Sequence, residues 1–298
     1  MKWNFNRMGS VVFFWLIFSP TAHAVSAELL SESEAIFAQP HDIEVGPGGR
    51  FIYVADKDNN LIQILDAMSL KIMASFGKLH LNRPHDVSFD KNGQLFVADT
   101  ENNRIAVFRG SGTSWEFERD IIAQMAKPEG IDFNIHNNTM YVANTALNEV
   151  TLYNANKFTA RIAKGSDETV EIFSNPHDVE IGFDGLIYIS DPGNNRLKIY
   201  NPDLSLKKII GGKEYQFNEP KYLAVDHFGW IYVADQNNNK IKILNKNHQL
   251  VAQIPDNLTG PKKTQLNKPE GIAVYGKHLW VSDTGNNRVL LFEVFKIE

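Results

Sequence analysis

Six similar units predict an all-β chain folded as a six-bladed β-propeller. Each unit opens on a proline, and short runs rich in Val, Ile, Tyr and Phe follow, separated by turns of Gly, Asn and Asp. Such runs are typical of antiparallel strands. Each unit has room for four of them, and units of this kind bury their sheets by stacking around an axis. The six prolines are 44 to 49 residues apart: Pro40, Pro84, Pro128, Pro176, Pro220 and Pro269.

The second unit shows the expected order of strands. The alternating segment "DVSF" follows Pro84 directly and is expected to be the innermost strand. The turn "DKNGQ" leads to a second strand, "LFVAD", and an Asn-rich turn leads into a third, "ENNRIAVF". A fourth, more variable strand completes each blade. The Asp and Arg of the Asn-rich turns are interpreted as structural, with Arg104, Arg196 and Arg288 able to pair with acids on a neighbouring blade.

The last unit lacks a fourth strand. It ends in "RVLLFEVF", and six residues after Phe292 the sequence stops. The segment Val25–Phe37 precedes the first proline and has no blade of its own. We therefore expect this segment to complete blade six and close the ring, so that residues 25–298 form a single propeller domain.

The first 24 residues have the pattern of a secretory signal peptide. Lys2 and Arg7 precede the apolar run "VVFFWLIF", and "SPTAHA" ends at Ala24 with small residues at the expected cleavage positions. The run is shorter than the roughly 20 residues that span a membrane. We expect cleavage after Ala24, a secreted or periplasmic location and no membrane span afterwards; the alternative is an uncleaved N-terminal anchor.

Composition narrows the class of partner. The chain has no cysteine, and its 30 Lys and Arg stand against 35 Asp and Glu. Removal of Lys2 and Arg7 with the signal makes the balance more acidic, and no basic cluster suggests a nucleic-acid partner. An acidic surface suits a cationic ligand or a metal better. We expect a monomer that binds a peptide, protein or glycan at a channel mouth.

The residue after each proline is the main candidate for function. In a propeller the innermost strands line the central channel, so these six positions form a ring at one mouth. Three histidines and a carboxylate on four consecutive blades suggest a zinc site, because neutral imidazole is the commonest zinc ligand. In blade order the ring is His41, His85, Glu129, His177, Lys221 and Glu270, and the first four are the candidate ligands.

Acidic residues follow the ring along the same strands. Asp42, Asp86 and Asp178 come directly after the three histidines and are candidates to orient an imidazole of the next blade. Deeper in the channel, Glu44, Asp132 and Glu180 form a set that suits Ca²⁺. The alternative for all of these residues is ordinary polar lining of a channel, with the histidines copied by duplication.

The segment "PHDVSFDKNGQLFVADTENNRIAVF" resembles an NHL repeat, and six such copies cover residues 37–292. This resemblance implies the propeller fold but no particular activity. The Pro-His positions of His41, His85 and His177 also resemble those of peptidyl-α-hydroxyglycine α-amidating lyase, a six-bladed propeller whose catalytic zinc is held by three histidines. That resemblance implies a zinc-dependent lyase.

This sequence departs from the lyase family in three respects. The family takes its ligands from alternate blades, whereas these histidines lie on blades one, two and four. The family also has disulfides and a tyrosine in a turn after a strand, and this chain has neither. Tyr222, next to the ring position of blade five, is the one substitute, as a candidate catalytic residue.

Two classes of function remain open at this point. One is an exported binding propeller that uses its channel mouth and loops, with or without a divalent metal. The other is a metal-dependent lyase of the amidating type, or a related propeller hydrolase. Whether the protein is an enzyme is left open by the sequence.

Overall fold

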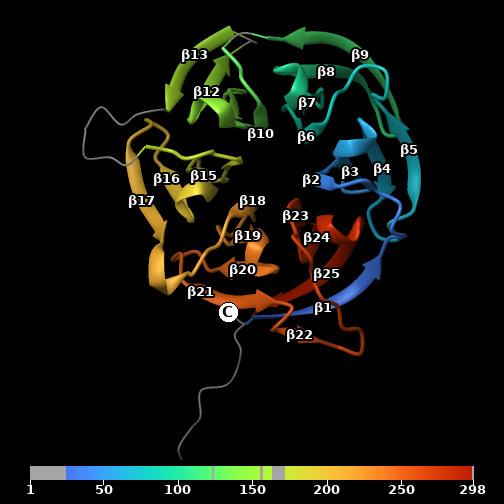
Figure 1. Ribbon diagram of the computed structural model, residues 1–298, viewed down its shortest axis with the longest axis vertical. Helices are drawn as coiled ribbons and strands as arrows, with labels where there is room; N and C mark the ends of the chain where they lie inside the picture. Colours follow the sequence, from blue (N-terminus) through green and yellow to red (C-terminus); the bar gives the residue numbers. More distant parts are fainter. Residues whose placement is uncertain (1–24, 123, 155–156, 163–171, 297–298) are drawn as a thin grey trace, which may run out of the picture.

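The computed structural model describes residues 25–122, 124–154, 157–162 and 172–296. Six sheets stand around a central axis, with the first strand of each nearest the axis (Figure 1). The predicted six-bladed propeller is confirmed. The signal-peptide prediction concerns residues 1–24, which lie outside the described ranges. Within those ranges no helix has the length and apolar character needed to cross a membrane.

Blades one to five are antiparallel sheets whose strands follow one another in the chain. Blade one contains β2 (Pro40–Val45), β3 (Phe51–Asp56), β4 (Leu61–Asp66) and β5 (Ile72–Phe76). Blade two contains β6 (Pro84–Phe89), β7 (Leu95–Asp99), β8 (Arg104–Ser111) and β9 (Ser114–Ile121). Blade three contains β10 (Pro128–Phe133), β11 (Met140–Asn144), β12 (Glu149–Asn154) and β13 (Lys157–Ile162). Blade four contains β14 (Val179–Ile181), β15 (Ile187–Asp191), β16 (Arg196–Tyr200) and β17 (Leu206–Gly211). Blade five contains β18 (Pro220–Val225), β19 (Ile231–Asp235), β20 (Lys240–Leu244) and β21 (Leu250–Ile254). Blade six instead combines β23 (Ile272–Tyr275), β24 (His278–Asp283) and β25 (Arg288–Lys296) with β1 (Val25–Glu32) from the N-terminal segment, and β22 (Leu258–Thr259) lies beside β1.

A one-turn 3₁₀ helix joins the second and third strands of every blade. These helices are η1 (Lys57–Asn59), η2 (Thr100–Asn102), η3 (Thr145–Leu147), η4 (Pro192–Asn194), η6 (Gln236–Asn238) and η7 (Thr284–Asn286), and η5 (Gly212–Glu214) follows β17. Each of the six turns ends on an asparagine with a left-handed backbone, φ 51–58°. Asparagine tolerates this conformation better than most residues. They are Asn60, Asn103, Asn148, Asn195, Asn239 and Asn287.

These asparagines join neighbouring blades. The side-chain oxygen of each accepts a hydrogen bond, at 2.8–3.0 Å, from the backbone N–H of the residue that precedes the proline of the next blade. The series closes on itself, because Asn287 of blade six accepts from Gln39 of blade one. The Asn-rich turn is therefore an inter-blade connection.

The arginines of the same turns could pair with acids on a neighbouring blade, but the acids that Arg104 and Arg288 contact among the described residues belong to their own blade. Nε of Arg104 lies 2.6 Å from Asp99 Oδ2, and Arg196 and Arg288 contact the aspartates five residues before them at 2.7 Å. Each aspartate is the buried last residue of the preceding strand in the same blade. Each arginine thus neutralises a buried carboxylate at its own turn.

The N-terminal segment closes the ring as predicted. β1 pairs antiparallel with β25, from Val25 opposite Lys296 to Glu32 opposite Leu290, and it also pairs parallel with β22. The two ends of the described chain thus share one blade (Figure 1). Alternate residues of β1, namely Val25, Ala27 and Leu29, are buried in the core.

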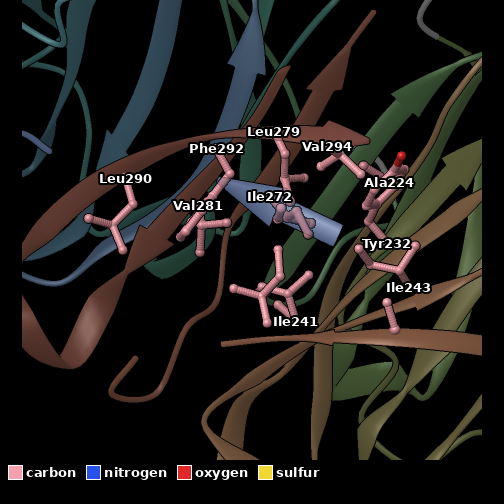
Figure 2. Close-up of a cluster of buried hydrophobic side chains, with 14 of the residues drawn as sticks. Ala224, Tyr232, Ile241, Ile243, Ile272, Leu279, Val281, Leu290, Phe292 and Val294 are labelled. Carbon is pink, nitrogen blue, oxygen red and sulfur yellow. The ribbon is translucent and has the colours of Figure 1, made fainter. Parts of the chain in front are cut away.

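The hydrophobic core is divided into six clusters, each drawn from two adjacent blades. Figure 2 shows the cluster between blades five and six, where Tyr232, Ile241 and Ile243 face Leu279, Val281 and Phe292. Blades are therefore held together by interleaved apolar side chains, which explains why a single unit cannot be stable alone.

We predict that Leu29→Ala weakens ring closure. Leu29 is 5% exposed and packs in the cluster between blades five and six. Removal of a buried leucine side chain costs about 2–4 kcal/mol, which corresponds to a melting temperature about 5–10 °C lower. Thermal unfolding followed by circular dichroism measures this shift. The control Glu34→Ala, at an exposed position just after β1, should melt within about 1 °C of the wild type.

Candidate functional site

The three ring histidines lie close together and are buried at one mouth of the channel. His41, His85 and His177 are 3%, 8% and 3% exposed. The ring centroids of His41 and His85 are 4.6 Å apart, and those of His85 and His177 are 6.3 Å apart. Tyr222 continues the row, with its ring centroid 4.7 Å from that of His177. Histidines from blades one, two and four therefore meet, although His177 is on the far side of the ring from His41.

The backbone before each proline sets how the histidines point. Gln39 and Arg83 have φ of 58° and 52°, and each turns its carbonyl toward the imidazole two residues later. Nδ1 of His41 lies 3.1 Å from Gln39 O, and Nδ1 of His85 lies 3.0 Å from Arg83 O. A carbonyl oxygen only accepts, so Nδ1 carries the proton in both residues and Nε2 is left for other contacts.

Two of the imidazoles face a carboxylate from the preceding blade. His41 Nε2 lies 2.9 Å from Glu270 Oε2, and His177 Nε2 lies 3.2 Å from Glu129 Oε2. The same pairing recurs between blades six and one and between blades three and four. His85 has no such partner because no glutamate stands at the ring position of the blade before it.

A glycine after each glutamate makes this pairing geometrically feasible. A Cβ on Gly271 would lie 2.1 Å from His41 O, and one on Gly130 would lie 2.7 Å from His177 O. Only glycine lets the two strands approach this closely. A Pro-Glu-Gly opening followed by Pro-His-Asp in the next blade is thus the sequence signal for a glutamate–histidine pair, and our sequence reasoning missed it.

The protonation of the ring follows from burial and neighbouring charge. Burial lowers the pKa of His85 and of His177 well below the usual value, helped by His41 in the first case and Lys221 in the second. Both are therefore neutral imidazoles at pH 7. Burial raises the pKa of Glu129. Burial also acts to raise the pKa of Glu270, but His41, Lys221 and Lys57 together outweigh it and lower that pKa.

Two buried polar atoms of the ring have no hydrogen bond within the described residues. They are Nδ1 of His177 and Oε2 of Glu270, whose contact with His41 is close but poorly aligned. Buried polar atoms are nearly always hydrogen-bonded, and exceptions gather at sites that bind or react. These atoms point to a place where a ligand completes the site.

Other polar side chains complete the ring, and two of them were not found from the sequence. Lys57, which begins η1, donates from Nζ to Gln39 Oε1 at 3.2 Å, and burial lowers its pKa. Gln236, at the start of η6, donates to Glu270 Oε1. Lys221 Nζ lies 3.6 Å from Glu219 Oε1 at the rim. Neither Lys57 nor Gln236 follows a proline, so the repeat pattern did not single them out.

Tyr222 contacts two of the three histidines at the channel mouth. It is 1% exposed, and its hydroxyl donates to the carbonyl oxygen of His85 at 3.1 Å. Burial raises the pKa of this hydroxyl well above the usual value, with Asp86 adding to the effect. It is thus a neutral donor already engaged with the backbone, which suits a positioning role.

The aspartates after the histidines contact backbone amides of the adjacent blade. Asp86 Oδ2 accepts from Ile131 N at 2.6 Å, and Asp178 Oδ2 accepts from Leu223 N at 2.8 Å. Deeper in the channel, Asp132 Oδ2 accepts from Ile181 N at 2.7 Å. These carboxylates connect one inner strand to the next. A role of the aspartates in orienting an imidazole stays a prediction.

Six carboxylates of the inner strands line a channel cavity of about 200 Å³: Asp42, Glu44, Asp86, Asp132, Asp178 and Glu180. Burial raises the pKa of Asp86 to about 6 and that of Asp132 to about 7. Burial and mutual repulsion also raise the pKa of four further groups well above their usual values, which are Asp42, Glu44, Asp178 and Glu180. These shifts all favour the protonated carboxyl, so the cluster carries less negative charge than its composition suggests.

In this arrangement the ring does not fit a metal ion. Across the part of the chain that the structure describes, no group of three or more His, Asp or Glu side chains is placed to hold one. Nδ1 of His41 and of His85 faces a backbone carbonyl, and Nε2 of His41 and of His177 faces a glutamate. The Zn²⁺ and Ca²⁺ sites remain predictions.

The fold and the ring together define a six-bladed propeller with a buried histidine–carboxylate cluster at one channel mouth. Comparison with protein-family models finds the NHL repeat at residues 81–108 and 266–292, in blades two and six. An LVIVD repeat is matched at residues 42–67, in blade one. Two of the six blades thus match the NHL repeat, which agrees with the resemblance seen in the sequence.

Curated relatives are amidating enzymes. The chain is 27% identical over 183 residues to peptidyl-glycine alpha-amidating monooxygenase B of Xenopus laevis, over 56% of this chain and 21% of that protein. It is 33% identical over 86 residues to a probable peptidyl-alpha-hydroxyglycine alpha-amidating lyase of Caenorhabditis elegans, over 26% of this chain and 24% of that one. The alignments thus span about a fifth to a quarter of these relatives.

Solved structures agree on the fold. Virginiamycin B lyase from Staphylococcus aureus superposes with a TM-score of 0.62 at 12% identity, over 90% of this chain and 98% of that chain. Identity this low supports a common propeller architecture and nothing finer.

We predict that Asp132 makes stability depend on pH. Its folded pKa of about 7 lies above the usual value of 3.8, so the folded chain binds this proton more tightly than the unfolded chain does. The stability gained is present at low pH and is lost as the pH rises through 7. Between pH 6 and 8 the loss is about 1 kcal/mol.

Asp132→Asn removes this contribution. Between pH 6 and 8 the wild type should therefore lose about 1 kcal/mol of unfolding free energy that the variant does not lose. Histidine titration affects both proteins equally and cancels in the comparison. Urea unfolding at several pH values measures the difference, with exposed Glu116→Gln as the control. Parallel curves for wild type and Asp132→Asn would contradict the assignment.

Proposed function

We propose that the histidine ring is the catalytic site of a lyase that acts on a peptide-derived substrate. The observation that carries this proposal is the pair of buried imidazole–glutamate contacts beside two ring atoms that lack a hydrogen bond. Buried ionisable groups with shifted pKa values gather at active sites. The similarity to amidating enzymes supports the same class of chemistry.

His177 is the general base in this proposal. Its lowered pKa keeps the imidazole neutral, and Nδ1 has no partner among the described residues. Glu129 holds Nε2 on the other side and stabilises the imidazolium that forms when Nδ1 takes a proton. Tyr222 fixes the position of the neighbouring His85 through its carbonyl and touches the ring of His177.

The substrate class follows from the name of one relative, a peptidyl-α-hydroxyglycine lyase. Such a substrate has a hydroxyl and an amide nitrogen on one carbon, next to a carboxylate. His177 takes the hydroxyl proton, a C=O bond forms as the C–N bond breaks, and the amide nitrogen gains a proton. The products are a carboxamide and glyoxylate, so the step balances without an oxidant or reductant. Lys57 and Lys221 supply the positive charge that a substrate carboxylate needs.

A second candidate is a binding propeller that holds a peptide, protein or glycan at the same mouth without reaction. It is favoured by the absence, within the described residues, of any group arranged to hold the metal that the lyase resemblance implies. Export through an N-terminal signal and a secreted or periplasmic location belong to both proposals. In the binding case the two atoms without hydrogen bonds would contact the ligand.

We predict turnover of an N-acyl-α-hydroxyglycine by the purified protein, measured as glyoxylate release with and without added Zn²⁺. His177→Gln should lower kcat at least about 100-fold, because general-base catalysis contributes roughly 10²–10⁴. His136→Gln, at an exposed histidine in the turn between β10 and β11, is the matched control and should retain full activity. Tyr222→Phe should alter kcat less than His177→Gln does.

The outcomes separate the two candidates. Glyoxylate release no faster than in buffer, under both metal conditions, rules out this lyase. Calorimetry with the unreactive N-acylglycine then tests binding at the ring. Binding that is weakened by His177→Gln but not by His136→Gln supports the binding propeller, and no binding excludes this ligand class for the ring.

A further inference from the structure

A second pocket lies between blades one and two, at the end of the strands opposite the histidine ring. It has a volume of about 360 Å³ and is walled by Phe51, Tyr53, Phe89 and Trp115. The ring of Tyr53 stands nearly perpendicular to those of Phe89 and Trp115, at 5.0 and 6.0 Å between centroids. Pockets of about 300–1,000 Å³ with apolar walls and a few polar groups are typical of small-ligand sites.

The polar ends of these aromatic side chains are already satisfied. The Tyr53 hydroxyl and Trp115 Nε1 both donate to Gly112 O, at 2.7 and 3.0 Å. The rings therefore offer apolar faces to the pocket. The charged group on its lining is Arg50, whose guanidinium lies 5.0 Å from the centroid of Phe51. Among the described residues Arg50 has no ion pair with an acid, and it is exposed.

The repeat shows why this recess is open. Phe108 and Phe292 occupy the same place in blades two and six, since they pair with Leu95 and Leu279 at corresponding positions of their blades. Four residues further on, blade two has Gly112 and blade six has Lys296. The Lys296 side chain fills its own recess between blades five and six. Its Nζ contacts Asp226 and lies 4.9, 5.4 and 5.7 Å from the rings of Trp230, Tyr232 and Phe228.

Glycine is not required at position 112 by the backbone. Gly112 has a φ of +57°, and the equivalent residues of blades four and five, Leu204 and His248, hold 68° and 64° with full side chains. The ring of His248 there lies 6.4 Å from Tyr188, the equivalent of Tyr53. A Cβ on Gly112 would meet only Phe51, at 3.8 Å. The missing side chain at this position therefore leaves a space that other blades fill.

The recess between blades one and two carries a positive side chain, whereas the filled recess between blades five and six carries a negative one. Blade five places Asp226 beside the ammonium of Lys296, whereas blade one has Gly46 in that place and carries Arg50 in the same turn. We propose that the pocket is a binding site for an aromatic carboxylate. The ring of the ligand packs among Phe51, Phe89 and Trp115, and its anionic group pairs with Arg50. This site is separate from the histidine ring and does not depend on the function proposed for it.

The test uses 2-naphthylacetate and its neutral amide as probes, and calorimetry measures their binding to the whole propeller. The acid should bind with a Kd below about 1 mM, and at least tenfold more tightly than the amide. Arg50→Gln should remove the preference for the acid and leave the amide unaffected. Gly112→His, which copies blade five, should abolish binding of both probes.

Controls keep the result independent of folding. Arg109→Gln removes an exposed arginine of β8 that does not line the pocket, and this variant should bind as the wild type does. Melting temperatures establish that Gly112→His is folded, and the exposed Arg50→Gln variant carries the test if it is not. No binding by the wild type, equal binding of acid and amide, or undiminished binding by folded Gly112→His would each overturn the proposal.

Discussion

The hydrogen bonds around the residue before each blade-opening proline hold the rest of the structure in place. That residue has a left-handed backbone in all six blades, with φ of 47–60°. This conformation is unfavourable for ordinary side chains, and more so before proline. Its N–H bonds to an asparagine of the previous blade, and the N–H one residue earlier bonds to the buried Asp or Asn that ends the second strand, at 2.7–3.1 Å. The two bonds offset the strain and fix where the inner strand begins.

The histidine ring is a direct result of this constraint. The strained residue directs its carbonyl at the imidazole two positions later, and so sets which nitrogen faces the channel in His41 and His85. The ring also repeats by halves. Blades one to three contribute His, His and Glu, and blades four to six contribute His, Lys and Glu. Both halves form the glutamate–histidine pair at their junctions, so Lys221 in the place of His85 is what distinguishes one side of the mouth from the other.

The fold was predictable because its signals are local and repeated. Prolines at regular spacing, alternating strands and Asn-rich turns specify the blades, and a missing fourth strand specifies the closure by β1. The glutamate–histidine pairs were harder to predict because each joins residues of two different blades that are far apart in the sequence. Burial, and not composition, raises the pKa of Asp132 to about 7, and the identity of the residue after Glu270 decides whether His41 can reach that glutamate. The partners of the turn arginines were not predictable because a charged pair within one turn and one between blades have the same sequence pattern.

Ring closure by β1 also has a consequence for the order of folding. Val25 and Lys296 are opposite each other in blade six, yet they are separated by nearly the whole described chain. Contacts between such distant segments form late, because the chain between them must first be ordered. Among the described strands, β1 therefore finds its main partner only when β25, the last of them, is available. Until β1 docks, its apolar face and the edge of β25 stay open, and we expect ring closure to be a late folding step.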